Sequence, residues 1–148
     1  MPNFSRRSRA IVDTCHNDII AVCNELILIT DFTVLHGHRK PEEQFELFKR
    51  GRFYKEGEWV LSNKTLVVTH YDGYKKLSKH NGDPSDAIDI TPYPINWKNL
   101  KRIHFLAGSF LTMAYRLRIQ NIITSSFSWG GHWNKFKDYP HFQIKRKV

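Results

Sequence analysis

Apolar side chains recur every three or four residues in two long segments of the chain, a pattern that predicts amphipathic helices. The first segment runs from about residue 8 to about residue 29, and the second extends from Asn96, a suitable N-cap, to the basic residues near position 118. A shorter helix is expected to begin at Pro41 and to end at Gly51, because proline suits the first helical turn and glycine suits a helix end. The pattern therefore predicts three helices.

Short β-branched or alternating runs predict strands between these helices. They are residues 32–36, 64–70, 87–91, 119–124 and 141–145. Strict alternation in the third run directs Ile88 and Ile90 to one face of the strand and Asp89 to the other. Together these elements predict an α+β fold, in which a small, largely antiparallel sheet packs against helices.

Composition bounds the size of the protein and the kind of partner it meets. The chain has 148 residues, a mass of 17.5 kDa and 41% hydrophobic residues, so residues 1–148 are expected to form one domain. The net charge of +9 indicates an anionic partner, which could be nucleic acid, a membrane surface or a bacterial wall polymer. No run has the length of a membrane span or the pattern of a signal peptide, which favours synthesis in the cytosol.

Two histidines and an aspartate stand where a catalytic metal site would need them. His80 follows a turn, Asp89 lies on the polar face of one expected strand, and His141 lies on that of another. Two imidazoles and one carboxylate leave a fourth zinc position open, which is the ligand count of a catalytic site. Asp138 precedes His141 by three residues and is placed like a general base. Without further motifs, a position on the surface beside a strand is the simpler interpretation of both histidines.

Several motifs occur in a specific order along the chain. They are Ser78-Lys79-His80, Ala87-Ile88-Asp89, Trp129-Gly-Gly-His-Trp133 and Asp138-Tyr-Pro-His141, preceded by His16-Asn-Asp-Ile and by Gly37-His-Arg39 with Gln44. This order resembles the zinc-dependent D-Ala-D-Ala carboxypeptidase and L-alanyl-D-glutamate peptidase family, and most of all its phage endolysin branch. The resemblance implies a hedgehog/DD-peptidase-like fold with no separate wall-binding domain.

The resemblance also implies roles for individual residues. His80, Asp89 and His141 would bind Zn²⁺, Asp138 would exchange protons with the attacking water and the leaving amine, and Arg39 would stabilise the oxyanion. Four further residues are expected to contact or orient the substrate: Ser78, Gln44, Trp129 and His132.

Two departures from the family pattern leave questions open. Eight residues separate His80 from Asp89, more than is usual in the family, so Asp86 is a rival ligand, although the context of Asp89 favours it. The second departure is His132, where relatives often carry aspartate. His132 could line the cleft or approach the metal.

The resemblance implies a phage endolysin that cuts peptidoglycan stem peptides, most simply at the L-alanyl-D-glutamate bond, and thereby lyses the host. Such a protein would be a monomer made in the host cytoplasm, would reach the wall through a holin, and would neither bind nucleic acid nor insert into a membrane. The alternatives are a D-Ala-D-Ala carboxypeptidase and a basic nucleic-acid-binding protein or metal-dependent nuclease. The last would use the cations Lys75, Lys76, Lys79, Lys98, Lys101, Arg102, Lys135, Lys137, Lys145, Arg146 and Lys147.

Overall fold

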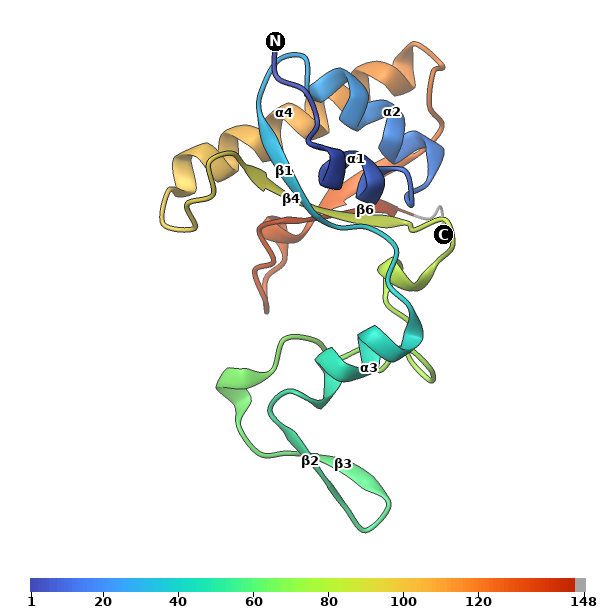
Figure 1. The fold of residues 1–148 in the computed structure, drawn as a ribbon, viewed down its shortest axis with the longest axis vertical. Coiled ribbons are helices and arrows are strands. Elements are labelled where there is room, and N and C mark those ends of the chain that lie inside the picture. The colour runs from blue at the N-terminus through green and yellow to red at the C-terminus, as the bar shows by residue number, and fades with distance from the viewer. Residues whose placement is uncertain (146–148) are drawn as a thin grey trace.

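The computed structural model describes residues 1–145, and Arg146 and Lys147 of the basic set lie outside the described residues. Its main sheet has four antiparallel strands in the order β1-β4-β6-β5 (Figure 1). The strands are β1 (Phe32–His36), β4 (Ala87–Pro92), β5 (Ser126–Trp129) and β6 (His141–Lys145). The expected α+β fold with a small antiparallel sheet is therefore confirmed, as are three of its strands.

Helices cover one face of this sheet. They are α1 (Arg6–Val12), α2 (Asn17–Leu26) and α4 (Leu100–Ile119), and their apolar sides share one core with the inward side chains of the strands. Phe110 of α4 lies at the centre of that core, fully buried, with its ring 4.3 Å from that of Phe142 and 5.3 Å from that of Phe127. The sheet consequently has its apolar contacts on one side and is free to present polar groups on the other.

The expected single helix over residues 8–29 is wrong, because the chain breaks it into α1 and α2. At the break, the amide of His16 donates to the carbonyl of Ser85, and the amide of Ser85 donates to the carbonyl of Thr14. The His16 ring then caps α2 by accepting a hydrogen bond from the amide of Asp18 at 3.1 Å. Helical periodicity continues through the break, but tertiary contacts with a distant loop interrupt the helix.

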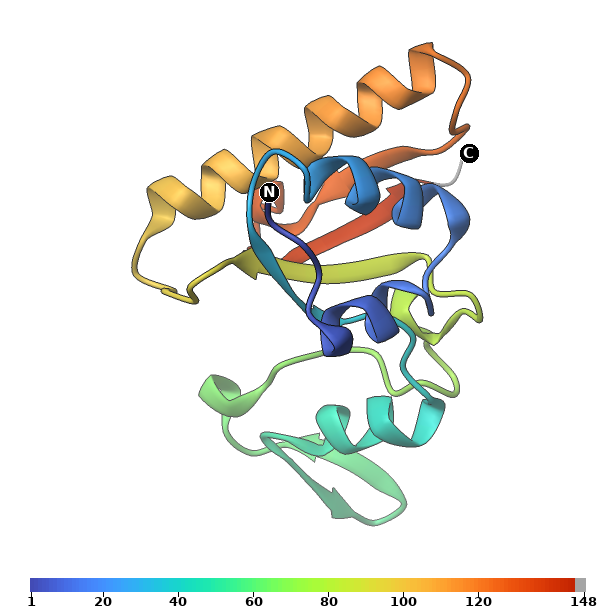
Figure 2. The same cartoon turned by 45° about the horizontal axis from the view of Figure 1, so that its top comes forward.

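The middle of the chain forms a lobe beside the sheet (Figure 2). It contains α3 (Pro41–Lys49), as expected, and a hairpin of β2 (Arg52–Lys55) and β3 (Glu58–Leu61) where loops were expected. The expected strand over residues 64–70 is wrong, since only a short 3₁₀ helix, η1 (Lys64–Leu66), forms there. In this lobe, aromatic rings of the hairpin pack on α3, as Trp59 does on Phe45 at 5.7 Å.

The long helix begins later than expected, and no strand follows it directly. Asn99, not Asn96, caps α4, with its side chain accepting a hydrogen bond from the amide of Arg102. Residues 119–124 form the end of the helix and a turn, so the strand expected there is wrong, and β5 begins at Ser126. The turn at Asn121 has a positive φ of 57°, which redirects the chain back toward the sheet.

Replacing Phe110 by alanine is expected to lower the free energy of unfolding by about 3–5 kcal/mol, because the ring is fully buried and its removal leaves a cavity. Chemical denaturation followed by circular dichroism measures this change. Phe105→Ala on the same helix is the matched control, since its ring is 65% exposed and its loss should change stability by only about 0.5 kcal/mol or less. Equal destabilisation by both substitutions would contradict the described packing of α4.

Candidate metal centre

Asp89 and His141 lie side by side because of strand register. They are directly paired residues of the antiparallel strands β4 and β6, so their side chains project from the same face of the sheet. Their neighbours Ile88, Ile90 and Phe142 enter the core from the opposite face. Asp89 Oδ1 lies 3.1 Å from His141 Nδ1, and both residues are buried. The pattern of alternation thus brings a carboxylate and an imidazole together on the side that no helix of the core covers.

His80 reaches the same point from the short 3₁₀ helix η2 (Lys79–Asn81). Ser78 caps this helix, and its hydroxyl accepts a hydrogen bond from the amide of His80. The Nδ1–H of His80 donates to the carbonyl of Gly37 at 2.8 Å, while the amide of Arg39 donates to the carbonyl of His80 at the same distance. A side chain at Gly37 would meet the Thr14 hydroxyl at 2.5 Å, so glycine is needed for this close approach.

Three electron-pair donors therefore converge in the structure. His80 Nε2 lies 3.2 Å from both Asp89 Oδ1 and His141 Nδ1. His80 Nδ1–H donates to the carbonyl of Gly37, and His141 Nε2–H donates to the side-chain oxygen of Gln143 at 2.9 Å. When the two rings are neutral, their other nitrogens therefore turn lone pairs toward the carboxylate of Asp89. Lone pairs at this distance repel unless a proton or a metal ion lies between them.

The spacing of these donors fits a tetrahedral zinc ion. Donors bound to zinc at 2.0–2.1 Å in tetrahedral geometry are about 3.3 Å apart. The observed separations of 3.1–3.2 Å are close to that value. Two histidines and a carboxylate are also donors that zinc prefers, and each histidine is held by a hydrogen bond at its other nitrogen.

The segment between His80 and Asp89 is fixed by the N-terminal helix break. Ser85 pairs with Thr14 and His16, and its hydroxyl donates to the carbonyl of Ala87 at 2.7 Å. Asp86 is held through its main chain, which bonds to Lys79 and to Ile144, and it is not part of the donor group. Of the two rival aspartates, the structure thus brings Asp89 to the histidines.

Electrostatics favour an ionised carboxylate at Asp89. Burial opposes its ionisation, but hydrogen bonds from His36 and from His141 in its protonated form, together with the charge of a protonated His80, outweigh burial. The pKa of Asp89 is therefore held well below its usual range. For His141, burial acts to lower the pKa, while the hydrogen bond and charge of Asp89 raise it above the ordinary value. The site is therefore built to hold positive charge next to Asp89.

Asp138 lies near the donor group, in the loop before β6. Its Oδ2 lies 4.0 Å from His141 Nδ1. Burial and the charge of Asp89 raise the pKa of Asp138 above its usual range. The loop closes through the amide of Asp138, which donates to the carbonyl of Gly130. A side chain at Gly130 would meet the Asp138 carbonyl oxygen, which explains why glycine occupies this position.

Arg39 is the cation next to the donor group. Its guanidinium lies 3.9 Å from Asp89 Oδ2 and donates to the side-chain oxygen of Gln44 at 2.9 Å. Gln44 is fully buried and donates in turn to the carbonyl of Tyr71 and to the hydroxyl of Thr69. Burial lowers the pKa of Arg39, and the charge of Asp89 opposes that effect. Gln44 therefore orients Arg39, a different role from the substrate contact expected from the sequence.

The structure places two further residues expected at the substrate outside the group of metal donors. Trp129 is 3% exposed, stacks on Phe142 and donates its ring N–H to the carbonyl of Tyr139, so the structure assigns it to the core. His132 is exposed and lies against the Trp129 ring with centroids 4.9 Å apart. It is outside the group of metal donors found among residues 1–145.

His36 and Trp133 border the site, although no role was expected for His36. The pairing of β1 with β4 shifts between Val34 and His36, and this bulge turns the His36 ring toward the site. Because Asp89 can only accept, His36 Nδ1–H donates to its Oδ2, at 3.2 Å. The Trp133 ring lies 5.2 Å from that of His141. A bulge leaves no mark in the hydrophobic pattern, so sequence periodicity could not reveal the His36 contact.

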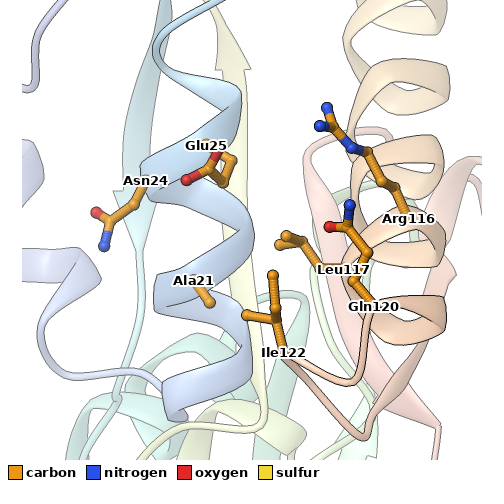
Figure 3. A pocket seen from close by; sticks show the side chains of 7 residues that line it. All are labelled: Ala21, Asn24, Glu25, Arg116, Leu117, Gln120 and Ile122. Carbon is orange, nitrogen blue, oxygen red and sulfur yellow. The ribbon is translucent and has the colours of Figure 1, made fainter.

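A hollow of about 410 Å³ lies between α1 and α3, and it is lined by two residues that contact Asp89 but by none of the three donors. His36 and Arg39 line it together with Glu43 and Leu47 of α3. A somewhat larger groove of about 450 Å³ lies between α2 and α4, lined by residues such as Glu25 and Arg116 (Figure 3). None of the predicted site residues lines that groove, so the hollow beside Arg39 is the better candidate for a ligand.

Comparison with known proteins agrees with this geometry. A family model described as D-alanyl-D-alanine carboxypeptidase matches residues 72–144, which include His80, Asp89, Asp138 and His141. The peptidoglycan L-alanyl-D-glutamate endopeptidase CwlK of Bacillus subtilis (strain 168) is 28% identical over 114 residues. That alignment covers 77% of this chain and 60% of CwlK, so the chain spans less than two thirds of the relative.

The solved structures support the fold. The L-Ala D-Glu endopeptidase ChiX of Serratia marcescens superposes with a TM-score of 0.68 at 21% identity, over 96% of this chain and 89% of that one. The fold is therefore shared across nearly the whole described chain. The family model, over residues 72–144, and the curated relative show that the chain is similar to the D-alanyl-D-alanine carboxypeptidase family of peptidases.

Proposed function

We propose that this protein is a zinc peptidase that hydrolyses the L-alanyl-D-glutamate bond of peptidoglycan stem peptides. The observation that carries the proposal is the convergence of His80, Asp89 and His141 on one point, with donor separations of 3.1–3.2 Å. Asp138 and Arg39 flank the same point with opposite charges. Similarity to a family of peptidases supports a peptidase reaction at this arrangement.

The choice of bond rests on the relatives. CwlK, at 28% identity, is named as an L-alanyl-D-glutamate endopeptidase of peptidoglycan, and ChiX, which shares the fold, as an L-Ala D-Glu endopeptidase. The net charge of +9 suits an anionic bacterial wall. These likenesses favour the endopeptidase within the family.

In the proposed reaction, the zinc ion bound by the three ligands would polarise the scissile carbonyl and lower the pKa of water. Asp138 accepts a proton from the attacking water and returns one to the leaving amine, for which its raised pKa and its partly exposed carboxylate are suited. Arg39 stabilises the negative charge that develops on the carbonyl oxygen, because Gln44 fixes its guanidinium beside Asp89.

A D-Ala-D-Ala carboxypeptidase is the second candidate, because that is how the matching family model is described. Such an enzyme must also bind the free carboxylate of its substrate. Arg39 is the half-buried cation next to the donor group, and the proposal already uses it for the oxyanion. A carboxypeptidase would need another cation at the site.

The phage endolysin role is the most specific part of the proposal, and the order of the motifs supports it. In that role the protein is a monomer synthesised in the host cytoplasm, reaches peptidoglycan through a holin and lyses the host.

Purified protein is expected to bind one zinc ion per chain, and Asp89→Ala is expected to lose it, because a ligand has been removed from a three-ligand site. Metal analysis after dialysis measures the content. Asp86→Ala is the matched control and should keep its zinc, since Asp86 is held through its main chain. Loss of zinc from Asp86→Ala and its retention by Asp89→Ala would show that Asp86, and not Asp89, is the zinc ligand.

Asp138→Asn is expected to keep both the fold and the zinc but to lose about a hundredfold or more in kcat, because an amide cannot accept the proton of water. Rates of peptidoglycan solubilisation measure the loss, and metal analysis confirms that the site is intact. Asp31→Asn, at an exposed position before β1, is the control and should be as active as the unaltered protein. A near-normal rate for Asp138→Asn would reassign the proton transfer.

The bond itself can be read from the products. After digestion of purified peptidoglycan, labelling of new amino termini and mass spectrometry should find D-Glu termini and released stem peptides. Release of free D-Ala without solubilisation would instead identify a carboxypeptidase. If the wall is unchanged while DNA is cleaved, the peptidase proposal fails.

A further inference from the structure

The net charge of the chain is confined to its last two fifths. Residues 1–89 contain 13 Lys and Arg and 13 Asp and Glu, so they are neutral overall. Residues 90–148 contain 10 Lys and Arg and a single acidic residue, Asp138, and therefore carry the whole net charge of +9. Such asymmetry is typical of a surface that meets an anionic partner.

The helix α4 presents much of this basic segment to solvent. Six of its exposed residues recur at helical spacing and form a stripe, called here the outer face of α4: Lys101, Phe105, Thr112, Tyr115, Arg116 and Ile119. Figure 2 shows α4 along the margin of the molecule, packed on the sheet from one side only. The opposite side of the helix holds Phe110 and the rest of its buried residues.

Large apolar side chains lie among the cations of this stripe. Phe105 is 65% exposed, Tyr115 60% and Ile119 62%, and Trp97 just before the helix is 51% exposed. Isolated exposed apolar residues are ordinary, but several of them on one helix face mark an interaction surface. A partner of this face must therefore offer apolar contact as well as negative charge.

The cations of the outer face are available to such a partner. Among residues 1–145, no ion pair involves Lys101 or Arg116. Glu25 lies across the groove between α2 and α4 from Arg116 and is the acid that lines it (Figure 3). The helix itself contains no acidic residue.

We propose that the outer face of α4 binds the surface of anionic phospholipid bilayers, with its axis parallel to the membrane plane. Lysine and arginine would contact lipid phosphates, while Phe105, Tyr115 and Ile119 would enter the boundary between headgroups and acyl chains. A second copy of the chain fits poorly, because the same cations would face each other. Nucleic acid and anionic wall polymers offer the charge, but no apolar layer for Ile119.

This binding mode is adsorption to one leaflet. In the described part of the chain, no helix combines the length and the apolar character of a membrane span. The donor group around Asp89 lies on the other face of the sheet from α4, so adsorption leaves the site open. The inference is independent of which bond the protein cuts.

Flotation with vesicles tests the proposal directly. The full chain is expected to float with vesicles of phosphatidylcholine mixed with phosphatidylglycerol, and to stay behind with phosphatidylcholine alone. The double variant Lys101→Gln and Arg116→Gln should bind more than tenfold more weakly, since each cation near an anionic bilayer contributes about a fivefold gain in affinity. The double variant Phe105→Ser and Ile119→Ser should also bind about tenfold more weakly, although its charge is unchanged.

Matched controls lie on the distant lobe. Lys55→Gln with Lys64→Gln removes the same charge, and Leu61→Ser with Leu66→Ser removes exposed apolar side chains, which are 50% and 56% exposed. Both controls should bind vesicles like the unaltered chain, and circular dichroism checks that all variants fold.

Three outcomes would overturn the proposal. The first is failure of the unaltered chain to bind anionic vesicles. The second is an equal loss in the outer-face and control charge variants, which would mean attraction by total charge. The third is unchanged binding by Phe105→Ser with Ile119→Ser, or binding to purified teichoic acid or DNA in place of vesicles, which would mean a polyanion site.

Discussion

The pairing of Asp89 with His141 across β4 and β6 is the constraint on which the rest of the site depends. Directly opposite residues of an antiparallel pair share a face, so this register places a carboxylate and an imidazole 3.1 Å apart. A slip of either strand by one residue would turn its own site residue, Asp89 or His141, toward the core. Packing of Phe142, Ile88 and Ile90 against the helices therefore fixes the chemistry as well as the fold.

The third donor depends on a chain of contacts around a buried polar cluster. His80 is held through Gly37, Ser78 and the main chain of Arg39, so the segments before α3 and before β4 are locked together. The segment before α3 also places the Arg39 guanidinium near Asp89, and the bulge of β1 brings His36 into a hydrogen bond with the same carboxylate. Burying so many polar groups is costly unless each is paired, and these contacts supply the partners.

The sequence predicted those features that follow from local pattern. Alternation in residues 87–91 put Asp89 opposite Ile88 and Ile90, and the order of the motifs brought His80 and His141 to it. Features that depend on distant contacts were missed. Hydrogen bonds to Ser85 interrupt the N-terminal helix, and the bulge of β1 turns the His36 ring toward the site. The hairpin β2–β3 was missed although the sequence holds a signal for it, which is Gly57. Glu56 and Gly57 form its turn with positive φ angles, and glycine is favoured where such angles are needed.

A crystal structure of the protein grown with zinc, with anomalous diffraction recorded at the zinc edge, tests the central claim most directly. We expect one strong anomalous peak per chain, within bonding distance of His80 Nε2, Asp89 Oδ1 and His141 Nδ1, with Asp138 and Arg39 beside it. A peak that lies at Asp86 or at His132, or the absence of any peak at the three donors, would contradict the account.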